Sequence, residues 1–330
     1  MNIQTEAADR AASDEGAFII GRLERRIACQ DKTLRCVDLI DNPALEEIDL
    51  QACKTPLHLT VRGCPKLARV LLPEAGAPAV IHWDFGTGSD PVVIHGMLGQ
   101  FDSCQDDGAT TRVASEAAPF ACTLLLSKAA DPPNFSHEID AELLICLSEN
   151  LPDGLALFGP DSSLRLAVLN GVDLPTDFAI GAKRLHSLTL VGAAKIASVS
   201  VAVPLGLLEI ESCPRITRIA ASGGRLRVAG GHADEIRVEG AWASGQFTDT
   251  TSRLGLSLID HLTATGCRHI QPDHLMLENA THPLGVLPAP DCLHDPKWRG
   301  LLLGFVHHTS NSTSILPALK LLGLLMQSGL

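Results

Sequence analysis

Short segments of apolar, variable, apolar order recur every eleven residues near the start of the chain. Val37-Asp38-Leu39, Ile48-Asp49-Leu50, Leu59-Thr60-Val61 and Val70-Leu71-Leu72 begin at positions 37, 48, 59 and 70. Alternating apolar residues are typical of a strand with one buried face, and a constant step indicates that such strands stack as repeats. The sequence therefore predicts a mainly β solenoid whose core grows along an axis.

A small, turn-forming residue follows the strand segment in several of these units. Asn42, Cys53 and Cys64 each stand five residues after the first apolar position of their unit, and Cys213 and Cys267 follow later strand segments. Asn hydrogen-bonds backbone groups that are exposed where a chain leaves a strand, and Cys packs as a small hydrophobic side chain. We predict that these residues are structural corners and that the cysteines among them are reduced and buried.

The same strand pattern returns in the second half of the chain. It occupies 188–190, 208–210, 226–228, 236–238, 262–264 and 275–277. The register is poor between about 85 and 160, where 124–126, 143–145 and 155–157 are candidate strands. We therefore expect one solenoid with an irregular middle.

Two segments carry a resemblance to a known family. Residues 59–67 (Leu-Thr-Val-Arg-Gly-Cys-Pro-Lys-Leu) and 208–216 (Leu-Glu-Ile-Glu-Ser-Cys-Pro-Arg-Ile) resemble irregular leucine-rich repeats, in which alternating apolar residues precede Asn or Cys. The resemblance covers roughly 34–280 and implies a right-handed leucine-rich-repeat-like coil. Because the eleven-residue step is half a usual repeat, we interpret it as two strand segments per coil of about 22 residues. A plain β-helix is the alternative.

The predicted organisation has four parts. Residues 1–16 form an acidic, mobile lead-in, and 17–33, with apolar residues at helix-like spacing, form the N-terminal cap. The solenoid spans 34–290, and 291–330 form a helical hairpin that caps the other end. The hairpin has more Leu than one apolar stripe needs, so we predict that it also offers a surface for association.

Composition and charge narrow the classes of partner. The net charge of −12 argues against binding to nucleic acid or anionic membranes, which attract Lys and Arg. The chain has no signal-peptide pattern and no uncharged apolar run of about 18 residues. We expect a cytoplasmic protein that does not enter membranes, with secretion as an effector as the alternative.

Sequence patterns for metal or nucleophilic chemistry are weak. A Cys and His cluster lies near the C-terminus, but its Cys-x-His pairs are spaced too closely for a usual zinc site; its members are Cys267, His269, His274, His282, Cys292 and His294. No nucleophile motif of the Gly-x-Ser-x-Gly type is present. We predict no metal and no cofactor.

Charged residues at variable strand positions are the candidate binding residues. Arg227 and Arg237 stand between two apolar strand residues and should project outward, and Arg218 lies nearby. Asp38 and Asp49 occupy equivalent positions one step apart. These five residues predict a non-catalytic scaffold that recognises a protein partner. The alternative is a β-helix hydrolase or lyase that acts on an acidic polysaccharide, with Asp38 and Asp49 as its acids.

Overall fold

A computed structural model describes residues 16–85, 91–105, 110–114, 118–126, 140–147, 156–250 and 253–265. The chain divides into two compact units: unit 1 comprises Met1–Leu157 and Ser162–Ala167, and unit 2 comprises Phe158–Asp161 and Val168–Leu330. Strands dominate both units, which confirms the mainly β solenoid. The acidic lead-in up to residue 15, Cys267, the strand at 275–277 and the helical hairpin lie outside the described residues.

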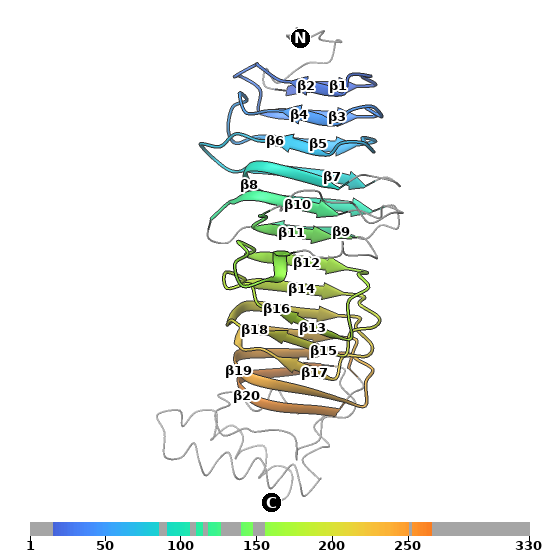
Figure 1. The fold of residues 1–330 in the computed structure, drawn as a ribbon, viewed down its shortest axis with the longest axis vertical. Coiled ribbons are helices and arrows are strands. Elements are labelled where there is room, and N and C mark those ends of the chain that lie inside the picture. The colour runs from blue at the N-terminus through green and yellow to red at the C-terminus, as the bar shows by residue number, and fades with distance from the viewer. Residues whose placement is uncertain are drawn as a thin grey trace, which may run out of the picture. The chain divides into compact units, whose positions relative to one another are not determined.

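Unit 1 is built from two ladders of parallel strands (Figure 1). Ladder A contains β1 (Gly16–Ile20), β3 (Cys36–Ile40), β5 (His58–Arg62), β7 (Ala79–Phe85) and the later part of β8 (Val92–Gln105). Ladder B contains β2 (Arg26–Ala28), β4 (Glu47–Asp49), β6 (Arg69–Leu71) and the earlier part of β8. Cys36 lies beside His58, and Glu47 beside Arg69, so each of these coils takes two of the eleven-residue steps. This confirms the prediction of two strand segments per coil.

The predicted inward residues form the core of these coils. Val37, Leu39, Ile48, Leu50 and Leu59 are all fully buried. The residues between them, such as Asp38 and Thr60, are only partly buried and lie on the outward face. Strand alternation therefore separates an aliphatic interior from a variable surface, as the sequence predicts.

The turns that follow three strands of ladder A share one backbone conformation. Gly21, Asp41 and Gly63 each adopt a left-handed φ of 53–62°. Gly21 N–H and Asp41 N–H donate to the carbonyls of Ile40 and Arg62 in the next coil, at 3.1 and 3.0 Å. The left-handed residue changes the direction of the chain. The backbone hydrogen bonds between coils nevertheless continue at this residue. Glycine adopts the left-handed conformation at the least steric cost.

Asn42 fills the corner that follows Asp41. Its side chain is fully buried and connects three parts of the backbone. Asn42 Oδ1 accepts the N–H of Arg22 at 2.8 Å, and Nδ2 donates to the carbonyls of Ile19 and Ile40 at 2.8 and 3.1 Å. The amide thus satisfies backbone groups of two successive coils that would otherwise be buried without partners.

The parallel pattern changes within β8. The later part of β8 pairs antiparallel with β9 (Thr110–Ala114), and the earlier part pairs antiparallel with β10 (Phe120–Leu126). β10 then pairs parallel with β11 (Leu143–Cys146). The expected strands at 124–126 and 143–145 are therefore present. The third candidate is wrong, because the described part of 155–157 belongs to the 3-10 helix η1 (Ala156–Phe158).

Unit 2 repeats the two-ladder arrangement. Ladder C contains β14 (Ser187–Val191), β16 (Leu205–Glu211), β18 (Gly223–Ala229) and the later parts of β19 (Glu235–Thr248) and β20 (Arg253–Thr265). β12 (Leu166–Asn170), which pairs with β14, begins in unit 1 and continues into unit 2 from Val168. Ladder D contains β13 (Asp177–Ile180), β15 (Ser198–Val201), β17 (Arg218–Ala220) and the earlier parts of β19 and β20.

The coils of unit 2 become shorter along the chain. Asp177 pairs with Ser198 in an early coil, and Ser244 pairs with His261 in a late coil, where the separation in sequence is smaller. The two strands of a coil also merge: β19 and β20 run continuously through both ladders, and a register shift between Val238 and Ala241 marks the bend of β19. The eleven-residue step is therefore a property of unit 1.

The start of the solenoid differs from the prediction. Residues 17–33 have apolar residues at helix-like spacing, but Gly16–Ile20 and Arg26–Ala28 form β1 and β2, which pair with β3 and β4. The helical expectation for this segment is wrong, because inter-coil strand pairing overrides the local apolar spacing. Within the described residues, the solenoid already includes β1 at Gly16, ahead of the predicted start at residue 34.

Candidate functional site

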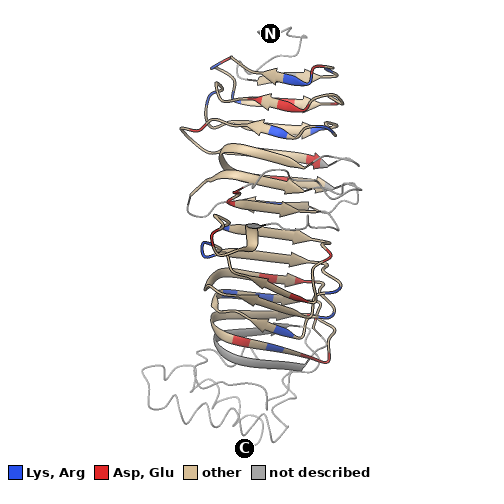
Figure 2. Ribbon diagram, viewed as in Figure 1, with Lys and Arg blue, Asp and Glu red and all other residues tan. Residues whose placement is uncertain are grey.

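Two of the predicted arginines lie side by side on ladder D. Arg218 of β17 pairs in register with Arg237 of β19. Their side chains are 55% and 68% exposed, so both guanidinium groups reach solvent. Figure 2 shows basic and acidic positions on neighbouring strands of unit 2. We call Arg218, Arg237 and the two glutamates that hold them, Glu235 and Glu239, the arginine face.

Both arginines are held by glutamates of β19. Arg218 donates from Nε to Glu239 Oε1 at 3.0 Å and from Nη2 to Oε2 at 2.8 Å. Arg237 Nε donates to Glu235 Oε1 at 2.9 Å. The hydrogen bonds with Glu239 raise the pKa of Arg218, and they lower the pKa of Glu239. Because these groups are solvent-exposed, the pairs orient the guanidinium groups more than they stabilise the fold.

The surface beside the arginine face contains several short side chains. Ser198 pairs with Arg218, and Ser200 pairs with Ala220. Ala179 lies beside Ser200 on the next strand, and both are exposed. Because these neighbours are short, they leave the arginine side chains accessible from the direction perpendicular to the sheet.

Arg227 lies on a different ladder from the other two arginines. It belongs to β18 in ladder C, where it pairs in register with Glu209 and Gln246. Its Nη1 lies 3.5 Å from Glu209 Oε1, and its side chain is 49% exposed. The chain between Arg218 and Arg227 crosses from one ladder to the other, so the predicted three-arginine patch is divided between two faces.

Asp38 and Asp49 are also divided between ladders. Asp38 lies in β3 of ladder A, and Asp49 lies in β4 of ladder B. Asp49 Oδ1 accepts the N–H of Gln51 at 3.0 Å, which is a local turn contact. The two carboxylates are thus presented by different strand ladders, although the eleven-residue step makes their positions look equivalent in the sequence.

A second polar face lies on ladder A and was not found by sequence reasoning. Three residues lie in register on neighbouring strands and form one row across the sheet: Asp102 of β8 lies between His82 of β7 and Arg112 of β9. Asp102 Oδ2 lies 3.4 Å from His82 Nδ1, and Oδ1 lies 3.3 Å from Arg112 Nε. In the next row, Arg62 Nε donates to Asp84 Oδ2 at 2.8 Å.

The residues of this face come from distant positions in the sequence. β9 pairs antiparallel, so the eleven-residue step gives no register for Arg112. The alternation of Val80-Ile81-His82-Trp83-Asp84 is visible in the sequence and predicts a strand with His82 and Asp84 on one side. That signal would have identified His82 and Asp84, which are two of the five residues of this face.

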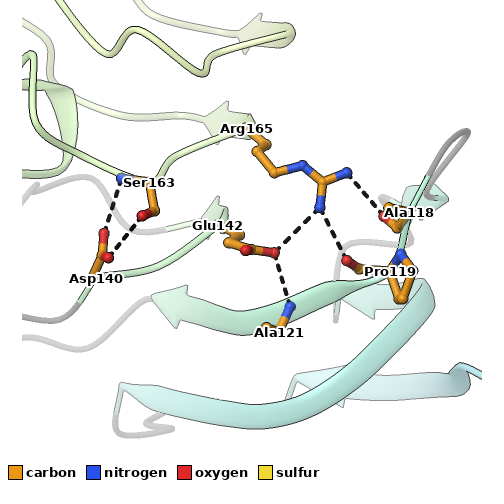
Figure 3. A network of polar contacts seen from close by, with 7 residues as sticks. All are labelled: Ala118, Pro119, Ala121, Asp140, Glu142, Ser163 and Arg165. Carbon is orange, nitrogen blue, oxygen red and sulfur yellow. Dashed lines mark hydrogen bonds and ion pairs between the residues drawn. The ribbon is translucent and has the colours of Figure 1, made fainter. Parts of the chain in front are cut away.

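Arg165 organises a network of polar contacts within unit 1 (Figure 3). Its Nη1 donates to the carbonyl of Pro119 at 3.0 Å and to Glu142 Oε2 at 3.3 Å, and Nη2 donates to the carbonyl of Ala118 at 3.0 Å. The guanidinium carbon also lies 5.2 Å from the centre of the Phe120 ring. Through these contacts Arg165 fixes the segment at the start of β10, so we assign Arg165 a structural role.

The cysteine corners are buried thiols. Cys64 and Cys213 repeat the geometry of Asn42: each Sγ lies 3.3–3.4 Å from the carbonyl two residues before it and 3.9 Å from a carbonyl of the preceding coil. Burial raises the pKa of both thiols, that of Cys213 to about 11. Cys53 is also buried, at the turn after β4. None of these three is joined in a disulfide.

The described residues contain no group of three or more side chains suited to hold a metal ion. Within the same ranges, no helix has the length and apolar character of a membrane span. No family model, curated protein or solved structure matches the chain. The likeness of 59–67 and 208–216 to leucine-rich repeats therefore stays a prediction.

Proposed function

We propose that the chain is a non-catalytic scaffold that recognises a protein partner through the arginine face of ladder D. The observation that supports this most is the pair of adjacent, exposed arginines, Arg218 and Arg237, each oriented by a glutamate. Arginine is enriched at protein interfaces because its planar fork binds carboxylates and carbonyls and stacks on aromatic rings.

The contacts around the two arginines reduce the cost of binding. An isolated surface arginine loses rotamer freedom when a partner immobilises it. Arg218 already makes a two-point contact with Glu239, and Arg237 is held by Glu235, so part of this ordering is complete before binding. The short neighbour Ser198 leaves room for a partner to approach.

The charge of the face favours a protein over a polyanion. Arg218 and Arg237 are matched by Glu235 and Glu239. Nucleic-acid binding draws its affinity from basic side chains that neutralise phosphates, and here nearby carboxylates already compensate the two arginines. A protein surface with both acidic and basic groups complements this mixed pattern.

Partner capture with matched variants tests the proposal. Arg218→Gln/Arg237→Gln removes both positive charges of the arginine face. Arg227→Gln is the control, since Arg227 is similarly exposed and paired but lies on ladder C. Immobilised full-length chains are incubated with extract of the native organism, and captured proteins are quantified by mass spectrometry.

We expect at least one protein to be captured by the parent and by Arg227→Gln, and to be strongly depleted with the double variant. Circular-dichroism melts of all three should coincide, because exposed ion pairs add little stability. Equal capture by the double variant would remove the arginine face from consideration.

The second candidate is a β-helix hydrolase or lyase that acts on an acidic polysaccharide. The polar face of ladder A supports it, because Asp102, His82 and Arg112 lie in one row beside Asp84 and Arg62. A carboxylate can act as acid or base while arginines bind the carboxylates of the glycan. Turnover of an acidic polysaccharide that is lost in Asp102→Asn and kept in Asp49→Asn would favour this candidate over the scaffold.

A further inference from the structure

One coil of unit 1 has a neighbouring coil on one side only. Among the described residues, β1 pairs with β3 alone and β2 with β4 alone. We call residues 16–28, which contain β1, β2 and the turn between them, the edge coil (Figure 1). An edge strand has backbone N–H and carbonyl groups on its outer side that can pair with a further strand. The edge coil presents two such strands, one in each ladder.

The contacts on the inner side of β1 identify its outer backbone groups. Gly21 N–H donates to the carbonyl of Ile40 at 3.1 Å, and the carbonyl of Ile19 accepts from Asn42 Nδ2 at 2.8 Å. Residues 19 and 21 therefore direct backbone groups toward the next coil. Because this direction alternates along a strand, the N–H and carbonyl of Ile20 are directed to the outer side. A further strand can pair with them there.

The edge coil also carries the large apolar side chains that are exposed in the described part of the chain, Ile20 at 57% and Leu23 at 78%. Ile20 lies in register with Ile40, which is only partly exposed. Ile40 has a described strand on both sides, with Ile20 and Arg62 beside it, whereas Ile20 has one on a single side. A strand added to the edge would therefore cover Ile20 as the neighbouring strands cover Ile40, and would remove an exposed apolar surface.

The form of this edge favours a second copy of the chain over an extended peptide. A single peptide strand can add to β1 or to β2 but not to both, because they belong to different ladders. A partner that covers both must present two strands at the same spacing. The edge coil of another copy presents them, and a two-fold axis that passes through both ladders sets each strand antiparallel to itself.

Self-pairing also suits the residues of the two strands. In full register, the first residue of a strand lies beside the last residue of the same strand in the copy. β1 then sets Ile20 beside Gly16, which has no side chain to obstruct it, and β2 sets Arg26 beside Ala28. The turn at 21–25, with its two further arginines, falls at opposite ends of the two copies. Like charges, which destabilise a sheet when they lie directly opposite, are thus kept apart.

We propose that two copies of the chain associate through their edge coils, with β1 and β2 each paired antiparallel to the same strand of the other copy. The interface joins ladder A to ladder A and ladder B to ladder B, so that both sheets continue across it. It covers Ile20 on each side. The association is independent of the proposed function, because the arginine face lies on ladder D of unit 2.

Gel filtration with light scattering, run on the full chain over a range of concentrations, tests the proposal. The parent should have twice the mass of one chain and should shift toward the single mass on dilution. Ile20→Lys should have the single mass where the parent is a dimer, because a charge on an edge strand opposes pairing. Ile40→Lys is the matched control. It places the same charge at the register position one coil further in, and should keep the doubled mass.

Hydrogen exchange of the parent chain tests the same interface without any variant. Peptides that cover 16–20 and 26–28 should exchange faster once dilution has given the single mass, whereas peptides that cover β5 should not change. A chain with the single mass at every concentration would overturn the proposal. So would a dimer that persists in Ile20→Lys, which would place the association on another surface, or an equal loss of the dimer in Ile40→Lys.

Discussion

Replacement of Asn42 by Ala should weaken unit 1 more than any single change of a corner cysteine. Asn42 is fully buried, accepts the N–H of Arg22 and donates to the carbonyls of Ile19 and Ile40. Alanine retains none of these contacts. The Asn42→Ala change therefore leaves backbone groups of two coils without hydrogen-bond partners. It also leaves unfilled the space that the Asn42 side chain occupies.

The magnitude follows from the three contacts. A hydrogen bond contributes roughly 1 kcal/mol net, and a buried group left without a partner costs about 1–3 kcal/mol. Three bonds with partial access of water to Arg22 give about 3 kcal/mol for Asn42→Ala. Cys64→Ala, at the equivalent corner one coil later, loses longer sulfur contacts of 3.3 and 3.9 Å and should cost about 1 kcal/mol.

Asn42→Asp separates hydrogen bonding from packing. The carboxylate can still accept from Arg22, but it has no proton for the carbonyls of Ile19 and Ile40 and places a charge among them. We therefore expect Asp to be no better than Ala despite its matching shape.

Urea unfolding and hydrogen exchange measure the effect. Solenoids unfold by segments, so exchange into peptides that cover β1 and β3 reports the local loss that a global signal averages away. An Asn42→Ala variant that is no less stable than Cys64→Ala, with unchanged exchange at residues 16–40, would refute the reasoning.

Two further outcomes are expected. Gly63→Ala should destabilise by about 1–2 kcal/mol in urea, and by more than Gly21→Ala, because both have a φ of +62° but only at Gly63 would a Cβ meet Asp41 Oδ1, at 2.2 Å; equal losses would contradict this. Arg165→Met should cost about 1–2 kcal/mol and speed proteolysis near 118–121, and an unchanged cleavage rate would argue against its role.

Sequence periodicity predicted the fold correctly in the part of unit 1 where strands and turns repeat at a constant spacing. The eleven-residue step located β3 to β6 and a coil made of two such steps, because each strand must bury the same face. It failed at 17–33, where consecutive apolar residues satisfy a helix and a strand equally. It also failed around β8, whose antiparallel partners depend on contacts between strands and not on a repeat.

The arginines show why a site is harder to predict than a fold. Arg218, Arg227 and Arg237 are close in sequence, and all are exposed. In a solenoid, neighbours on the surface are residues one coil apart, such as Arg218 and Arg237. Arg227 falls about halfway between them in the sequence and therefore lies on ladder C. Coil length in that part of the chain, which the sequence did not supply, decides which side chains meet.

The turns that follow strands were only partly recognisable from glycine positions in the sequence. Glycine follows a strand at positions 21, 63, 171, 192 and 230, and all five have left-handed φ angles. Asp41, Ser212 and Asp249 adopt the same conformation without being glycine. A search for glycine alone would have found most corners and missed these three.

The coils between β3 and β7 have the same length in sequence, so this part of the chain can lose or gain a whole coil without a change of register. Deletion of 36–57 would place His58 beside Gly16 and Arg69 beside Arg26, with every inward residue still inward. Deletion of a single residue within β5 would instead turn core side chains such as Leu59 toward water, because side chains alternate between faces. Within these constant coils of unit 1, duplication or loss of a whole coil therefore preserves the interior and changes only how many coils present side chains at the surface.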